Sequence, residues 1–196
     1  MLLLAITHLL WGLLYTDVPP TPSPTLTPTV TPSPTFTPTV TPSPTPVPCT
    51  PDNATDCATL VIPVLEIETE LTAFKIRGAS WRISPWERLV GHLERTDWFG
   101  EGHTVLGGHA VLGDHITPGV FNTLGELQPG DEIFVRLNDA EIRYTVTAVY
   151  ETEYDDMRVI DQQHTNRLTL ITCDVPSRDP VTGNYDKRVV VVAERS

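Results

Sequence analysis

The chain has 196 residues, a formal net charge of −12 and 40% hydrophobic residues. This charge argues against a nucleic-acid-binding protein, because phosphate contacts require an excess of Lys and Arg. It also argues against docking of a globular surface on anionic lipid. Thirteen of the nineteen prolines lie between Val18 and Pro51. The remaining part, from about Cys57 to Ser196, is long enough to bury one sizeable hydrophobic core.

Residues 1–17 form a hydrophobic N-terminal segment rich in Leu. The segment is shorter than the about 20 residues that a membrane-spanning helix requires. It also lacks the basic leader of a signal peptide, since the first Lys or Arg is Lys75. Two interpretations stay open, the trailing part of a longer membrane anchor and an atypical signal. In either case we expect the chain to meet the membrane through this segment.

Residues 18–56 form a Pro/Thr-rich stalk with an internal repeat. The decamer Thr-Pro-Ser-Pro-Thr-Leu-Thr-Pro-Thr-Val at 21–30 recurs at 31–40 with Phe36 in place of Leu. Because proline and hydroxyl side chains cannot build a packed core, we expect a disordered, extended stalk. At about 3.1 Å per residue, some thirty residues reach roughly 90 Å. The stalk contains no candidate catalytic group, so its removal should leave any activity of the folded part near that of the full chain.

The three cysteines are Cys49, Cys57 and Cys173. The first two are near neighbours at the point where the stalk meets the domain. A disulfide between them would suit an oxidising, extracytoplasmic setting, and two unpaired thiols are the alternative. If the pair is bridged, Cys173 remains as a free, reactive thiol.

From residue 58 the sequence pattern indicates β-strands separated by turns. Strands are predicted at 59–63, 65–71, 104–106, 132–137, 141–152, 167–173 and 187–194, with one or two helical turns within 120–127. Asn138-Asp139 is the predicted turn of a hairpin. About eight short strands with little helix predict an all-β fold, a closed or nearly closed β-barrel with short helices.

Three stretches carry side chains suited to cleaving a peptide bond. The strand Thr169-Leu170-Ile171-Thr172-Cys173 ends on a thiol, although a cysteine there is more often a small buried hydrophobe. An earlier strand, predicted at 104–106, leads into Gly107-Gly108-His109, and we expect the two glycines to leave open space around the backbone. The last predicted strand opens with Lys187-Arg188.

Together these stretches resemble the sortase family, the cysteine transpeptidases of bacterial cell surfaces, and the resemblance covers roughly residues 59–195. It implies the same β-barrel fold, with the class, D-, E- or F-like, left open. Cys173 would be the nucleophile, because a thiolate can attack a carbonyl. His109 would donate a proton to the leaving amine, and Arg188 would steady the oxyanion, as the resemblance also implies.

The resemblance further implies an extracytoplasmic enzyme at the cell surface. Cys173 would attack a carbonyl in a C-terminal sorting motif of a surface protein, typically of the Leu-Pro-x-Thr-Gly kind. An amine on a cell-wall component or a pilin subunit would then resolve the thioester. Two other interpretations stay open: a processing protease, in which water resolves the thioester, and a non-catalytic β-barrel that binds surface peptides.

Three residues are candidates for substrate binding. Thr172 and Asp174 flank Cys173, and the loop that begins at Asp174 should shape the pocket. His92, in Val-Gly-His-Leu-Glu, is either structural or at the groove edge.

Metal binding is a weaker interpretation of the remaining pattern. His103, His109 and His115 are spaced by six residues, a step that neither a helix nor a strand brings together reliably. We therefore expect no metal site in these histidines and no cofactor. Acidic side chains between Glu151 and Asp156 could bind calcium, as some sortases do, and a solvated face is the alternative we favour.

Overall fold

The computed structural model describes residues 47–78, 80–161 and 165–196. The predicted segment 1–17 and most of the predicted stalk lie outside these residues. The described part contains the helix α1 (Ala54–Cys57), short 3-10 helices at Pro51–Asn53, Pro63–Leu65, Leu124–Glu126, Met157–Ile160 and Val175–Ser177, and the strands β1 (Ala58–Ile62), β2 (Ile67–Phe74), β3 (Ile76–Arg77), β4 (Ser80–Trp81), β5 (Val90–Leu93), β6 (His103–Gly108), β7 (Glu132–Leu137), β8 (Ala140–Glu153), β9 (Arg167–Cys173) and β10 (Lys187–Arg195). Within it, no helix has the length and apolar character needed to cross a membrane.

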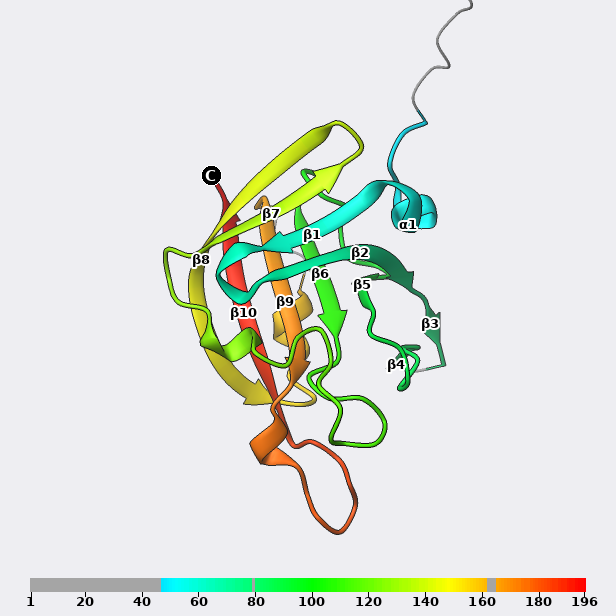
Figure 1. Ribbon diagram of the computed structural model, residues 1–196, viewed down its shortest axis with the longest axis vertical. Helices are drawn as coiled ribbons and strands as arrows, with labels where there is room; N and C mark the ends of the chain where they lie inside the picture. The colour runs from blue at the N-terminus through cyan, green and yellow to red at the C-terminus, as the bar shows by residue number, and fades with distance from the viewer. Residues whose placement is uncertain (1–46, 79, 162–164) are drawn as a thin grey trace, which may run out of the picture. The chain divides into compact units, whose positions relative to one another are not determined.

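Eight of these strands close into a barrel in the order β1-β2-β5-β6-β9-β10-β8-β7 (Figure 1). The pairs β2–β5 and β6–β9 are parallel, and the other neighbours are antiparallel. β3 and β4 form a separate two-stranded sheet. This architecture confirms the predicted all-β barrel of about eight strands.

The two faces of β6 and β9 belong to different apolar clusters, because successive side chains of a strand point to opposite faces. Leu106 and Leu170 contribute to the main core. Val105 and Ile171 belong instead to a smaller cluster with Phe74, Leu93, Trp81 and Ile83. This second cluster provides an apolar floor on the face of the sheet that the candidate site occupies.

Most predicted strands agree with the structure within a few residues. The strand predicted at 65–71 begins later, because residues 63–65 form a 3-10 turn that ends on Glu66 with φ +55°. The helical turns predicted within 120–127 are a single 3-10 turn at Leu124–Glu126. β5 was not predicted, because all four of its residues are buried and no polar alternation marks it.

The residues from Cys49 to Asp56, assigned to the stalk from the sequence, pack against the barrel. Cys49 and Cys57 form a disulfide. The indole Nε1 of Trp98 donates to the carbonyl oxygen of Cys49 at 3.0 Å, and Ala54 is only 2% exposed within the main core. This end of the predicted stalk is therefore part of the folded unit.

Candidate active site

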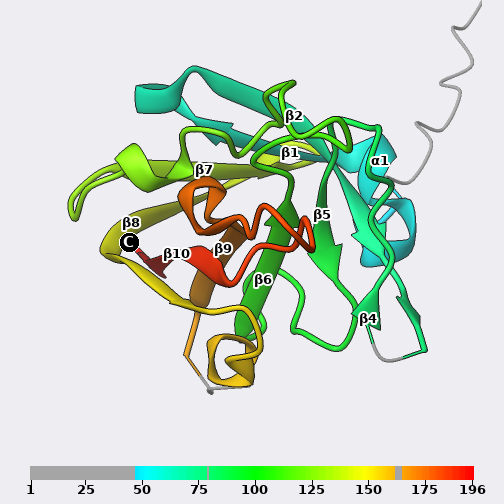
Figure 2. The same ribbon diagram turned by 90° about the horizontal axis from the view of Figure 1, so that it is seen from below.

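Cys173 and Arg188 lie opposite each other at one end of the barrel. Cys173 ends β9, and Arg188, near the start of β10, is its Cα partner. Next to them, the amide of Asp174 donates to the carbonyl of Lys187 at 3.1 Å. That contact makes 174/187 a hydrogen-bonded pair and 173/188 a non-hydrogen-bonded pair, the kind in which side chains approach more closely. Figure 2 looks onto this end, with the loop between β9 and β10 in front of the barrel.

Both side chains line a cavity of about 410 Å³. Its floor includes Leu93 and Ile171 of the smaller apolar cluster. Trp81 and Ile83 line it from the segment that contains β4, and residues 152–157, 159 and 160 line it from the end of β8 onward. The cavity therefore combines a thiol, a guanidinium and an apolar floor.

His109 follows β6 at the level of Cys173. The parallel register of β6 and β9 pairs Gly107 with Ile171, and the Thr172 hydroxyl donates to the carbonyl of Gly108 at 2.9 Å. The His109 ring does not line the cavity; its Nε2 lies 2.9 Å from the carbonyl oxygen of Ser84. A carbonyl only accepts hydrogen bonds, so Nε2 carries a hydrogen and Nδ1 is the other, exchangeable position.

The two glycines before His109 do not leave open space, contrary to the sequence-based expectation. A Cβ on Gly108 would lie 2.7 Å from the ring of the fully buried Phe121. The amide of Phe121 donates to the His109 carbonyl at 3.0 Å, and a Cβ on Gly119 would lie 2.0 Å from that oxygen. Glycine is therefore required at positions 108 and 119, because the loop after β6 folds back tightly onto the backbone around His109.

The guanidinium of Arg188 is held by three neighbours. Its Nη1 donates to the carbonyls of Tyr185 and Lys187, each at 2.9 Å. Its central carbon lies 5.9 Å from the centre of the Tyr154 ring, within the range of a cation–π contact. No sequence pattern marks Tyr154 or Ser84, because Tyr154 reaches Arg188 through the strand order and Ser84 contacts His109 through its main chain.

The surroundings of Cys173 disfavour its thiolate. Burial raises the pKa of the thiol, because it removes water from the charged form. The positive charge of Arg188 lowers this pKa, and the carboxylate of Asp174 raises it. The net direction is upward, so the resting thiol is predominantly neutral near pH 7.

The three predicted substrate-binding residues lie in different environments. Thr172 lines the cavity, although its hydroxyl is committed to Gly108. Asp174 is buried beside the cavity, and its carbonyl accepts from the Ser177 hydroxyl at 2.7 Å. His92 is 3% exposed, does not line the cavity, and packs edge-on against Trp98. The structure thus brings only Thr172 to the cavity wall.

The structure does not bring the three evenly spaced histidines together. His103 is buried, with Nδ1 2.8 Å from the carbonyl of Asp161 and Nε2 2.7 Å from the hydroxyl of Thr169. His115 lies 2.9 Å from the Tyr185 hydroxyl. Across residues 47–78, 80–161 and 165–196, no group of three His, Cys, Asp or Glu side chains is arranged to hold a metal ion.

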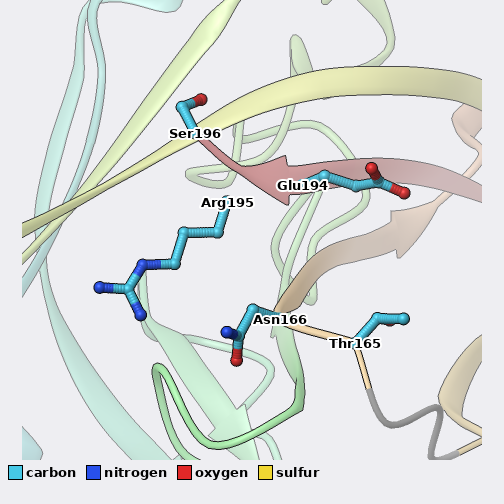
Figure 3. A pocket seen from close by; sticks show the side chains of 5 residues that line it. All are labelled: Thr165, Asn166, Glu194, Arg195 and Ser196. Carbon is cyan, nitrogen blue, oxygen red and sulfur yellow. The ribbon is translucent and has the colours of Figure 1, made fainter.

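A separate hollow, unconnected with the candidate site, lies at the opposite end of β9 and β10 (Figure 3). Its volume is about 540 Å³, and it is lined by Thr165, Asn166, Glu194, Arg195 and Ser196. It contains neither a thiol nor an imidazole. Its position at the start of β9 and the end of β10 separates it from Cys173.

Comparisons with known proteins agree with this fold. The sortase domain family matches residues 60–196. Sortase A of Bacillus anthracis is 32% identical over 115 residues, which cover 59% of this chain and 47% of that protein. The chain thus matches about half the length of this relative.

Solved structures show the same fold. A sortase D5 transpeptidase of Clostridium perfringens has a TM-score of 0.56 and 24% identity, covering 71% of this chain and 78% of that one. Sortase A of Listeria monocytogenes has a TM-score of 0.56 and 22% identity, covering 71% and 86%. With the family match spanning most of the chain and the barrel described above, this chain belongs to the sortase family.

Proposed function

We propose that this chain is a cysteine transpeptidase that cleaves a C-terminal sorting motif of surface proteins and joins the new carboxyl end to an amine. The observation that carries the proposal is the pairing of Cys173 with Arg188 on the wall of the 410 Å³ cavity. Membership of the sortase family supports the same reaction class. The cavity volume falls within the range of about 300–1,000 Å³ that is common for ligand sites.

In the first half-reaction, the Cys173 thiol gives its proton to Nδ1 of His109, and the resulting thiolate attacks the carbonyl carbon of the scissile peptide bond. The carbonyl oxygen becomes an oxyanion, which the Arg188 guanidinium stabilises through directed N–H donors. His109 gives a proton to the departing nitrogen, the C–N bond breaks, and a thioester on Cys173 remains. Because the Nε2 hydrogen is directed at Ser84, Nδ1 is the nitrogen that would deliver this proton.

In the second half-reaction, an amine attacks the thioester carbonyl. The amine proton passes to His109, the C–S bond breaks, and the thiolate leaves. One amide is consumed and another is formed, so the reaction needs no cofactor and no net hydrolysis. The apolar floor formed by Leu93 and Ile171 suits the aliphatic residue of a Leu-Pro-x-Thr-Gly motif.

Location and domain roles are part of the proposal. Residues 1–17 would contact the membrane, residues 18–56 would serve as a stalk whose end from Cys49 packs against the barrel, and residues 57–196 would form the catalytic domain. The Cys49–Cys57 disulfide supports an extracytoplasmic setting, where such bridges persist. The partners would be surface proteins that bear a sorting motif and an amine acceptor on the cell wall or on a pilin subunit.

The test is incubation of the chain with a Leu-Pro-x-Thr-Gly peptide, with and without triglycine, followed by mass spectrometry. The expected result is an acyl adduct on Cys173 and a ligated product that needs triglycine. Cys173→Ala should retain the fold and lose both species. A product formed by water alone, even with triglycine present, would indicate a processing protease. Binding of the peptide without an adduct would indicate a non-catalytic barrel.

A further inference from the structure

Arg188 stands on a wall between two cavities. Together with Tyr154 it lines the 410 Å³ cavity that contains Cys173 and a second cavity of about 590 Å³. The second cavity is formed mainly by residues 179–186, from the loop that joins β9 to β10. The orientation of the guanidinium therefore decides which cavity receives its positive charge.

The sheet places Tyr154 on the same face as Arg188. Arg188 pairs with Thr152 of β8, and residues two apart on a strand share a face. The amide of Tyr154 donates to the Asp186 carbonyl at 2.9 Å, which extends this register beyond the end of β8. Tyr154 is thus the diagonal cross-strand neighbour of Arg188, a relation that lets an aromatic side chain reach its partner.

The other contacts of Arg188 leave one face of the guanidinium for the ring. Among the described residues, its hydrogen bonds all start from Nη1 and end on the carbonyls of Tyr185 and Lys187. These two bonds hold one nitrogen but not the plane of the group. The Tyr154 ring, 5.9 Å from the central carbon, limits rotation of that plane.

Carboxylates on both sides compete for the guanidinium charge. Asp179 and Asp186 line the second cavity. On the side of Cys173, the acidic groups are Asp174, next in sequence to the thiol, and the lining residues Glu153, Asp155 and Asp156. Asp156 is already paired with Arg158 at 2.8 Å. In the second cavity, Asp179 already accepts from the amides of Val181 and Thr182, which leaves Asp186 as the other carboxylate there. Without the ring, the guanidinium could turn toward Asp186 as well as toward the thiol, because both sides offer negative charge.

We propose that Tyr154 is a positioning residue whose ring holds the Arg188 guanidinium toward Cys173 and away from the second cavity. Its effect on turnover rests on the proposed function. Its effect on the thiol does not, because Arg188 favours the Cys173 thiolate in the free enzyme as well. The thiol therefore reports the position of Arg188 without any substrate.

The experiment measures the alkylation rate of Cys173 with iodoacetamide against pH, together with kcat and KM for peptide ligation. Cys173 is the single cysteine outside the disulfide, so the reaction reports one site. Tyr154→Leu removes the ring, Tyr154→Phe retains it, and Tyr154→Gln is a second variant without a ring. Tyr150→Leu is the matched control. Tyr150 is an exposed tyrosine of β8, close to Tyr154 in the chain, and it lines neither cavity.

Tyr154→Leu should slow alkylation near pH 7 and lower kcat by about two- to fivefold, the size of one exposed cation–π contact. Tyr154→Phe and Tyr150→Leu should behave as wild type, and Tyr154→Leu should have no further effect in an Arg188→Ala background.

Alkylation of Tyr154→Leu and Tyr154→Gln at the wild-type rate would overturn the proposal. So would an effect that persists without Arg188 or that appears only in KM, because the ring would then contact substrate. If wild type ligates no peptide, the proposed function fails, and alkylation still decides the role of Tyr154.

Discussion

The ring of His109 and the main-chain carbonyl of Ser84 are joined by a 2.9 Å hydrogen bond. This bond fixes the hydrogen on Nε2 and makes Nδ1 the basic nitrogen of the neutral ring. We expect nitrogen-15 NMR of histidine-labelled protein to find the Nε2–H tautomer for neutral His109. Ser84→Ala retains the main-chain carbonyl and should give the same spectrum. The Nδ1–H tautomer would contradict the geometry.

The alkylation profile of Cys173 should depend on its two charged neighbours in opposite directions. Burial raises the pKa of the thiol, so the wild-type profile should have its midpoint above that of a free cysteine. Asp174→Asn removes a negative charge and should shift the midpoint to lower pH, whereas Arg188→Ala should shift it to higher pH. A measurement by iodoacetamide reaction needs no substrate. Shifts in the same direction for both variants would contradict this account.

Arg188→Lys should not be conservative. Lysine retains the charge but loses the planar fork that can bind Tyr185 and Lys187 carbonyls through one nitrogen while the other donors face an oxyanion. The expected loss is on the order of 10²-fold, mainly in kcat, as for removal of one oxyanion donor. Steady-state kinetics of Arg188→Lys beside Arg188→Ala measure it, with Arg195→Lys at the other end of β10 as the control. If Arg188→Lys retained nearly all activity, Arg188 would act only through its positive charge and not through directed N–H donors.

The site was predicted from the sequence to the extent that it depends on local pattern. Cys173 closes one predicted strand and Arg188 opens the next, so alternation and the turn between them were enough to put them on one sheet. The partner of Arg188 on its other side was not predictable, because Tyr154 follows a strand that is earlier in the chain. Likewise the sequence left His92 as either structural or at the groove edge, and the buried position of β5 against Trp98 decides for the packing role.

The disulfide and the residues around it should contribute to stability. The Cys49→Ser/Cys57→Ser double variant should lose about 2–3 kcal/mol of unfolding free energy, as expected for closure of a short loop. Truncation before Cys57 should cost more, because it also removes buried Ala54 and the acceptor of the Trp98 indole. This differs from the expectation that the whole stalk is dispensable. Urea denaturation tests it, and a chain that begins at Val47 is the control, which should match full length.

Two buried histidines should make the fold sensitive to mild acid. Burial lowers the pKa of His92 and His103 below the ordinary value of 6.5. The unfolded chain then takes up these protons at higher pH than the folded one. The contribution of these two histidines to the free energy of unfolding is therefore fully present above about pH 6.5. It is lost as pH falls, by up to about 1.4 kcal/mol per pH unit for each histidine.

His103→Gln provides the specific check on this acid sensitivity. Glutamine can still donate to the Asp161 carbonyl and accept from the Thr169 hydroxyl, but it does not titrate. Urea unfolding between pH 7.5 and 5 should show a smaller loss of stability than in wild type. The exposed His115 gives the matched variant, His115→Gln, which should follow wild type. An unchanged slope in His103→Gln would assign the acid sensitivity to other groups.

The place of β10 between β8 and β9 also governs when the site can exist during folding. β8 pairs with β7 and β9 pairs with β6, and β10 closes the ring by pairing with both β8 and β9. A nascent chain that has not yet released β10 from the ribosome is an open sheet with two unpaired edges, and edges of this kind invite wrong pairing. Because Arg188 lies on β10 and its partner Cys173 on β9, the proposed catalytic pair cannot form before this last strand is available.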